Sequence, residues 1–192
     1  MRKLIIALLF TLSSFFVLDA QVQLSNPSFE GLEPQDATMP ISWLPCKLGT
    51  TPDILPGPWG VVKEASEGDT YLGLITRADN SWESITQRLT KIMKAGTCYE
   101  MDLDLARSIR YPGHNQPIVL KIYGTMEKCA EPELLYTSDL IKHTDWETYR
   151  LILTPSNNFR YLIFEAAYPG EEKTAGNILI DNIQVIRECD RA

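Results

Sequence analysis

The sequence predicts an all-β fold, either a sandwich or a barrel, and three observations carry this prediction. The segments with alternating apolar and polar residues are short, clusters of Gly, Pro, Asn and Asp separate them, and no amphipathic helix follows residue 20. Many short strands with turn residues between them are typical of all-β domains. Only residues 130–135 have the composition of a single helical turn.

The expected strands follow from the alternation of side chains along the chain. Segment 98–106 is the clearest, because Met101, Leu103 and Leu105 share one face and the acidic residues between them share the other. Further strands are expected at 71–75, 83–89, 118–123, 148–153, 161–167 and 178–186.

Residues 32–60 are expected to form a long loop region. They hold prolines at positions 34, 40, 45, 52, 56 and 58, together with Trp43 and Trp59. Proline lacks a backbone donor, so prolines at this density exclude a central strand throughout the region. Long ordered loops in compact domains frequently carry function.

Residues 1–20 have the features of a cleaved secretory signal. Arg2 and Lys3 precede an apolar run from 4 to 18, and the small residue Ala20 stands before the expected cleavage point. Residues 21–192 are then expected to form one secreted β-sandwich domain, in the periplasm or at the cell exterior. A retained N-terminal anchor is the alternative.

The acidic balance of the chain restricts its partners. It carries 18 basic and 25 acidic residues, a formal net charge of −7. Nucleic acids and anionic membranes favour a basic face, so we expect neither as the main partner, and no membrane insertion. The sequence does not indicate an oligomeric state.

The four cysteines are Cys46, Cys98, Cys129 and Cys189. An even number in a secreted chain predicts two disulfides, although buried free thiols are an alternative. The spacing alone leaves three pairings open.

Three short motifs occur in a characteristic order along the chain. N-P-S-F-E-G occupies residues 26–31, G-D-T-Y-L-G occupies 68–73, and I-D-N-I occupies 180–183. This order resembles carbohydrate-binding modules with the galactose-binding-like jelly-roll fold. The resemblance implies a two-sheet jelly-roll β-sandwich in which the first motif is a strand that starts the sandwich and the last motif is a strand that ends it beside the first. The proline-rich insert and the cysteines resemble extracellular modules of Gram-negative surface proteins.

The resemblance also implies a metal site and a disulfide pairing. In related sandwiches a structural calcium ion joins the first and last strands, and Glu30 and Asp181 stand at the matching positions. Alternatively, Asp181 only caps a turn or binds backbone amides. The jelly-roll topology that the resemblance implies places Cys98 near Cys189, so the expected disulfides are Cys98–Cys189 and Cys46–Cys129.

Enzyme motifs are sparse in this sequence. It contains no G-x-S-x-G, no H-E-x-x-H and no phosphate-binding glycine loop. Asp102 and Asp104 share a strand face, as the paired carboxylates of a glycoside hydrolase would, but alternating acids on an outer face are usually solvated. The two histidines, His114 and His143, are isolated in turn-like segments. We therefore expect a non-catalytic binding module, with a hydrolase as a distant alternative.

Aromatic residues are the strongest candidates for ligand binding. Sugars present flat C–H faces on which aromatic rings stack, and planar polar side chains then fix the hydroxyl groups. The candidates are Trp59, Arg77, Trp82, Arg107 and Tyr111. They predict recognition of a glycan or cell-surface polysaccharide. The alternative is a structural or adhesive cell-surface module that binds a protein, in which these rings only fill the edge of the sandwich.

Overall fold

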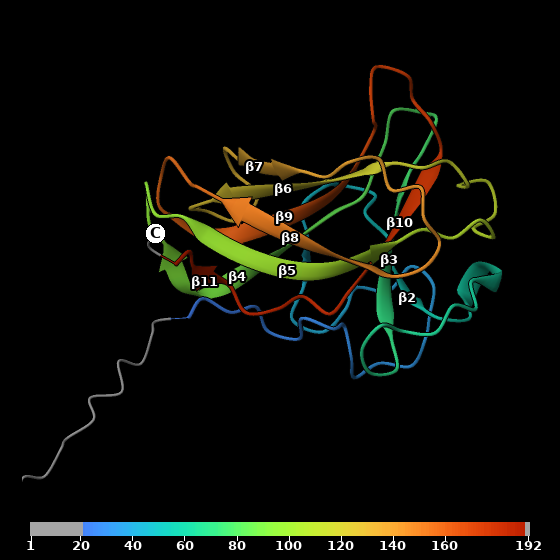
Figure 1. Ribbon diagram of the computed structural model, residues 1–192. Coiled ribbons are helices and arrows are strands. Elements are labelled where there is room, and N and C mark those ends of the chain that lie inside the picture. Colours follow the sequence, from blue (N-terminus) through green and yellow to red (C-terminus); the bar gives the residue numbers. More distant parts are fainter. Residues whose placement is uncertain (1–20, 191–192) are drawn as a thin grey trace, which may run out of the picture.

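A computed structural model describes residues 21–190 of the chain. These residues form eleven strands and one short 3₁₀ helix, arranged as two antiparallel sheets that pack face to face (Figure 1). The predicted all-β, two-sheet sandwich is confirmed. The signal-peptide prediction for residues 1–20 lies outside the described residues. Within 21–190, none of the helical structure is long and apolar enough to cross a membrane.

The first sheet has five strands in the order β1-β4-β9-β6-β7. Their bounds are β1 Leu44–Pro45, β4 Ser84–Met93, β9 Phe159–Ala167, β6 Val119–Thr125 and β7 Glu133–Thr137. The two-residue strand β1 lies at an edge, where the missing donor of Pro45 is tolerated.

The second sheet has six strands and follows the order β11-β5-β10-β3-β2, with β8 also paired to β5. Their bounds are β2 Asp53–Leu55, β3 Tyr71–Thr76, β5 Tyr99–Ala106, β8 Glu147–Leu153, β10 Gly176–Asp181 and β11 Arg187–Glu188. The 3₁₀ helix η1 spans Pro58–Gly60.

The main core lies between the sheets and follows the alternation of each strand. Leu103 of β5, Ile122 of β6 and Phe164 of β9 face inward and are at most 1% exposed. Burying one such side chain stabilises the fold by about 1.5–3 kcal/mol. A second cluster lies on the outer face of the second sheet and includes Tyr71 and Leu179.

Two predicted elements differ from the structure. The strand expected at 178–186 ends at Asp181, because Asn182 adopts a positive φ of 50° and turns the chain before β11 begins. Asparagine tolerates this left-handed conformation better than most residues. Residues 130–135 form no helical turn. Instead, β7 pairs with the edge of β6 and leaves Leu134 half-exposed.

The first motif also differs from its expected form. Residues 26–31 form a turn rather than a strand, with positive φ values at Asn26 and Phe29. The Asn26 side chain accepts a hydrogen bond from the Glu30 N–H (2.8 Å) and donates one to the Glu30 carbonyl (2.9 Å), which closes the turn. The first and last described segments still lie side by side, because Val22 pairs with Ile186.

Both disulfides follow the pairing that the jelly-roll resemblance implies. Cys46 is bonded to Cys129 with Cα atoms 5.3 Å apart, and Cys98 to Cys189 with Cα atoms 5.4 Å apart. These distances are ordinary for a disulfide. The described residues contain no free cysteine.

Candidate functional site

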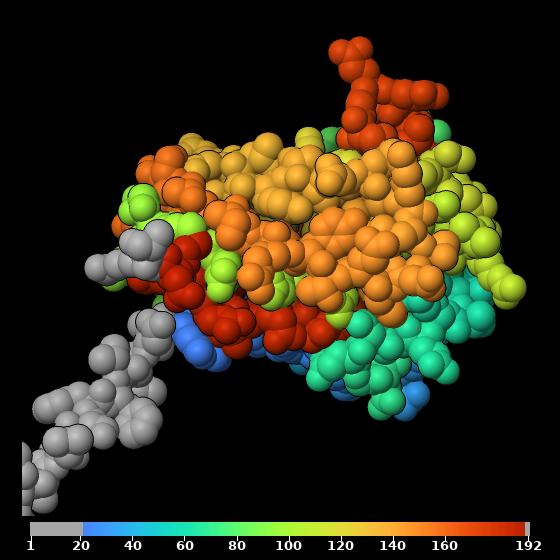
Figure 2. All heavy atoms as spheres, viewed as in Figure 1, coloured from blue at the N-terminus to red at the C-terminus, as the bar shows by residue number. Residues whose placement is uncertain are grey.

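Two loops cover the second hydrophobic cluster at one end of the sandwich. Loop 56–65 contributes Val61 and loop 107–114 contributes Tyr111, and both side chains pack on Tyr71 and Leu179 of the sheet. In Figure 2 these two loops form neighbouring surfaces at the right-hand end of the molecule. Strand β11 lies at the opposite end in Figure 1. The candidate site is built from these loops.

Trp59 is the exposed aromatic residue of the first loop. It stands in the sequence Pro56-Gly-Pro-Trp-Gly60 and is 49% exposed. Its φ is +57°, a conformation that is uncommon for a residue with a side chain and that clusters at functional sites. Pro56 and Pro58 have fixed φ angles, which restrict the backbone that leads into Trp59.

A cavity of about 140 Å³ lies beside Trp59. We call it the Trp59 cavity. Its walls are Ala37, Thr51, Asp53, Trp59, Ile75, Arg77, Tyr111, Pro112 and His114.

Tyr111 forms the buried wall of the Trp59 cavity. Its ring is 2% exposed, and its hydroxyl donates a hydrogen bond to the carboxylate of Asp53. Asp53 also accepts a hydrogen bond from the Ala37 N–H (2.8 Å). Burial, and then the Asp53 charge, raise the pKa of Tyr111 far above its ordinary value, so the phenol keeps its proton. A Cβ at Gly73 would stand 2.9 Å from Leu55 Cδ1 and 3.0 Å from the Tyr111 hydroxyl, so both side chains pack closely over the glycine.

An ion pair between Arg77 and Glu83 fixes a second wall. The Glu83 side chain is fully buried and lies 2.7 Å from the Arg77 guanidinium. It also accepts hydrogen bonds from the backbone N–H groups of Thr51 and Ile75. Burial raises the pKa of Glu83, and Arg77 partly offsets the rise. These contacts hold Arg77 in one orientation at the cavity.

The structure brings together three of the five predicted ligand residues. Trp59, Arg77 and Tyr111 line the Trp59 cavity, but Tyr111 offers no exposed ring, because its partner Asp53 and the covering loops bury it. The stacking role expected for Tyr111 is therefore not available to it.

Trp82 and Arg107 are not among the residues that line this cavity. The Lys47 ammonium stands 2.6 Å from the Trp82 ring centroid, and Tyr168 packs edge-on against the same ring. The Arg107 guanidinium donates to the carbonyls of Lys142 and Asn115, so it holds loops in place.

Sequence reasoning missed Asp53, Glu83 and His114 at this site. Asp53 and Tyr111 are separated by 58 residues, so only the fold brings them together. His114 Nδ1 lies 2.9 Å from the Thr76 carbonyl oxygen. A carbonyl only accepts, so Nδ1 carries the proton and Nε2 of the neutral ring is an acceptor.

The predicted calcium ligands hold opposite ends of one loop. Glu30 Oε1 accepts hydrogen bonds from the N–H groups of Asp69 and Thr70 (both 2.9 Å), and Asp181 Oδ2 accepts from those of Ser66 and Glu67 (2.8 and 3.0 Å). Burial raises the pKa of Asp181 to about 7, although backbone hydrogen bonds oppose the rise.

The donor chemistry of this pair suits calcium only in part. Carboxylate oxygens are the ligands that calcium prefers, but these are turned toward backbone N–H groups. Residues 21–190 contain no cluster of three or more His, Cys, Asp or Glu side chains that could hold a metal. Calcium binding at Glu30 and Asp181 stays a prediction.

The outer face of the first sheet is a second aromatic surface that the sequence reasoning did not single out. Tyr123 and Tyr161 are half-buried there, on the neighbouring strands β6 and β9. The Tyr123 hydroxyl donates to the Glu165 carboxylate (3.0 Å), so its polar tip already has a partner. Trp59 is more exposed and borders a cavity, which favours the loop end as the candidate site.

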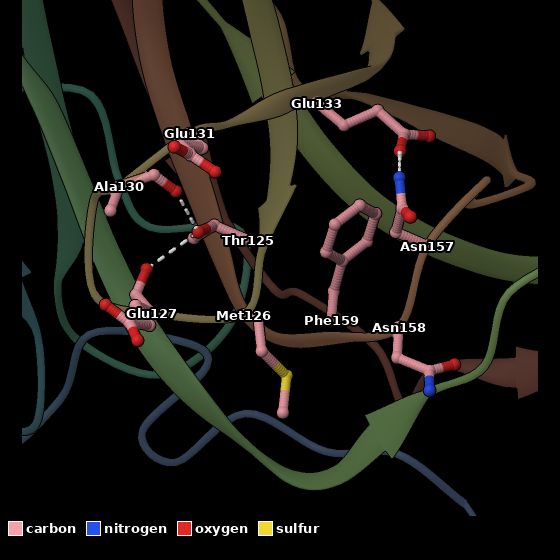
Figure 3. A pocket seen from close by; sticks show the side chains of 9 residues that line it. All are labelled: Thr125, Met126, Glu127, Ala130, Glu131, Glu133, Asn157, Asn158 and Phe159. Atoms are coloured by element: carbon pink, nitrogen blue, oxygen red, sulfur yellow. Dashed lines mark hydrogen bonds between the residues drawn. The ribbon is translucent and has the colours of Figure 1, made fainter.

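A further hollow lies where β6 ends and β9 begins (Figure 3). Its acidic residues are Glu127, Glu131 and Glu133. Glu133 is bound by Ser156 and by Asn157, whose side chain points toward it in Figure 3. The only ring in the lining, Phe159, is 4% exposed, so this hollow offers no aromatic face.

Known proteins resemble this chain in fold and not in sequence. No protein-family model matches it, and no curated protein matches it. The xylan-binding CBM22-1 domain of Xyn10C from Paenibacillus barcinonensis matches with a TM-score of 0.53 and 18% identity, over 86% of this chain and 93% of that domain. The chain therefore has the fold of a carbohydrate-binding module.

Two further matches come from enzymes. A cyclase from Fischerella sp. TAU has a TM-score of 0.61 and 12% identity, over 89% of this chain and 98% of the cyclase. The arabinose-bound α-L-arabinofuranosidase MgGH51 has a TM-score of 0.63 and 14% identity over 88% of this chain, which spans only 26% of that enzyme. At such identities the likeness concerns the fold alone, so the function has to be argued from the site.

Proposed function

We propose that the protein is a non-catalytic module that binds a glycan or cell-surface polysaccharide by stacking on Trp59. The observation that carries the proposal is a half-exposed indole on a constrained loop, next to a cavity with fixed polar walls. An aromatic group that is already ordered loses little entropy on binding. The carbohydrate-binding-module fold supports the same reading.

The carboxylates on the face of β5 support a binding role over hydrolysis. Asp102 forms an ion pair with Arg150 (3.1 Å). Burial alone would raise the pKa of Asp104, but hydrogen bonds from Ser66, Thr148 and Asn182 outweigh it, and the pKa lies below its ordinary value. A general acid in glycoside hydrolysis needs a raised pKa. Asp104 does not meet this requirement, and Asp102 is engaged by Arg150.

The proposed location is outside the cytoplasm. Two disulfides and the carbohydrate-binding-module fold are consistent with an extracytoplasmic protein. Within that compartment we propose the surface or periplasm of a Gram-negative cell, after removal of residues 1–20.

A glycan array with residues 21–192, followed by calorimetry on the strongest ligand, tests the proposal. Trp59→Ala should lose about 1–3 kcal/mol of binding free energy, the range measured for base stacking on aromatic side chains. Ile152→Ala is the control, because Ile152 is 52% exposed on β8 and lies outside the site. An unchanged affinity of Trp59→Ala would refute the proposed site.

Two other outcomes have a clear meaning. If Tyr161→Ala removes binding and Trp59→Ala does not, the ligand lies on the outer face of the first sheet. If no sugar binds, and a cell-surface protein binds even in the presence of every sugar competitor, this chain is the adhesive module that the sequence analysis gave as the alternative.

A further inference from the structure

Two hollows meet at Trp59. One is the Trp59 cavity, of about 140 Å³. The other, which we call the open hollow, has a volume of about 510 Å³ and is lined by Pro34, Gln35, Asp36, Gly57, Pro58 and Trp59. Trp59 lines both, so the two hollows adjoin the same residue.

The size of the Trp59 cavity limits what enters it. Pockets that enclose drug-sized ligands usually measure about 300–1,000 Å³, so 140 Å³ holds no more than one sugar ring. The buried pair of Tyr111 and Asp53 forms one wall, and Arg77, fixed by the buried Glu83, forms another. With these walls fixed and the volume this small, the cavity suits a ring at a chain end better than an internal ring with the chain continuing on both sides.

The charges around the cavity select the kind of sugar. Two carboxylates, those of Asp53 and Glu83, stand in or directly behind its walls, and both are buried. Arg77 is the one arginine or lysine in the lining, and it is paired with Glu83 and not with Asp53. Two carboxylates and one guanidinium leave a net negative charge around the cavity, which disfavours a sugar carboxylate. Hydroxyl groups suit the cavity better, because they are uncharged and can both donate to and accept from the polar side chains of its lining.

We propose that this site recognises the neutral sugar at the end of a glycan chain, with the terminal ring in the Trp59 cavity and the next ring over the open hollow. The proposal rests on the proposed function and specifies its ligand class. A chain-end ligand contributes one or two rings to the site, so further residues of the chain lie in solvent.

Calorimetric titration tests the proposal with defined probes. The first set contains methyl glycosides of galactose, glucose, mannose, xylose and arabinose. The second contains oligosaccharides of two to six residues that carry the best of these sugars at the non-reducing end. We expect the affinity to rise from one to two residues and then to change less than twofold up to six. The number of protein molecules bound per chain should stay at one.

Chemical changes to the chain end give a second readout. Replacing the terminal sugar by the corresponding uronic acid should weaken binding at least tenfold, and so should a bulky cap on its hydroxyl groups. An affinity that climbs steadily through six residues, or several protein molecules per chain, would overturn the chain-end inference. Equal binding of the uronic acid would overturn the preference for a neutral sugar.

The variants separate failure of this inference from failure of the proposed function. If Trp59→Ala lowers the affinity but binding grows with chain length, the glycan site stands and only the chain-end inference is wrong. If no probe binds, or Trp59→Ala binds every probe as the wild type does, the proposed function fails and the inference fails with it.

Discussion

Removal of one hydroxyl group from the wall of the Trp59 cavity should destabilise the protein measurably. In Tyr111→Phe, the buried Asp53 carboxylate loses the hydrogen bond from the phenol and keeps the one from the Ala37 N–H. Leaving a buried acceptor without its partner costs about 1–3 kcal/mol, and more for a charged group. We expect a loss of about 2 kcal/mol in the free energy of unfolding. For a chain of this size that lowers Tm by about 4–8 °C.

Urea and thermal unfolding, followed by circular dichroism, measure this effect, and Tyr168→Phe is the matched control. The single O–H of Tyr168 is shared between the backbone carbonyls of Arg77 and Ser81, at a half-buried position that water can reach. Its loss should cost less, about 0.5–1.5 kcal/mol. If the free energy of unfolding of Tyr111→Phe lies within 0.5 kcal/mol of the wild-type value, or if the loss is no larger than in Tyr168→Phe, the hydroxyl is not needed to satisfy the buried Asp53 carboxylate.

Three further predictions concern stability. Burial raises the pKa of Glu83. Its contribution to the free energy of unfolding is therefore fully present below the ordinary pKa of about 4.3 and is lost as pH rises through the pKa in the folded state. The wild type should lose stability relative to Glu83→Gln as pH rises, and parallel unfolding profiles would contradict this. Excess chelator should lower Tm of the calcium-loaded wild type but not of Glu30→Gln; identical melting curves would exclude a structural ion there. The Cys46→Ser/Cys129→Ser variant should lose at most about 4–5 kcal/mol, the chain-entropy value for a separation of 83 residues, and an unchanged urea midpoint would argue against that bridge.

Local pattern predicted the sheets well, because strand periodicity is visible within a few residues. The alternation of Met101, Leu103 and Leu105 identified β5, and the same reasoning located the other long strands. It failed where a single backbone angle decides the outcome, as at Asn182, which ends β10. It also missed β7, whose half-exposed side chains show no clear alternation.

The candidate site was only partly predictable. Trp59 was identified because proline and glycine around an aromatic residue signal a constrained loop. Tyr111 has a similar local setting, yet its ring is buried against residues far away in sequence. No local sequence pattern indicates that Asp53 binds Tyr111 or that Glu83 binds Arg77, since these contacts exist only after the sheets and loops have assembled.

The two disulfides interleave along the chain, in the order 46, 98, 129, 189. A single cut of the backbone anywhere between Cys46 and Cys189 therefore leaves both fragments joined by at least one bridge. A protease has to cut twice before any piece of this region can leave. A nicked molecule would keep its mass under non-reducing conditions and could keep its binding surface. Outside the cell, where damaged chains are not replaced by local synthesis, this connectivity would lengthen the working life of each molecule.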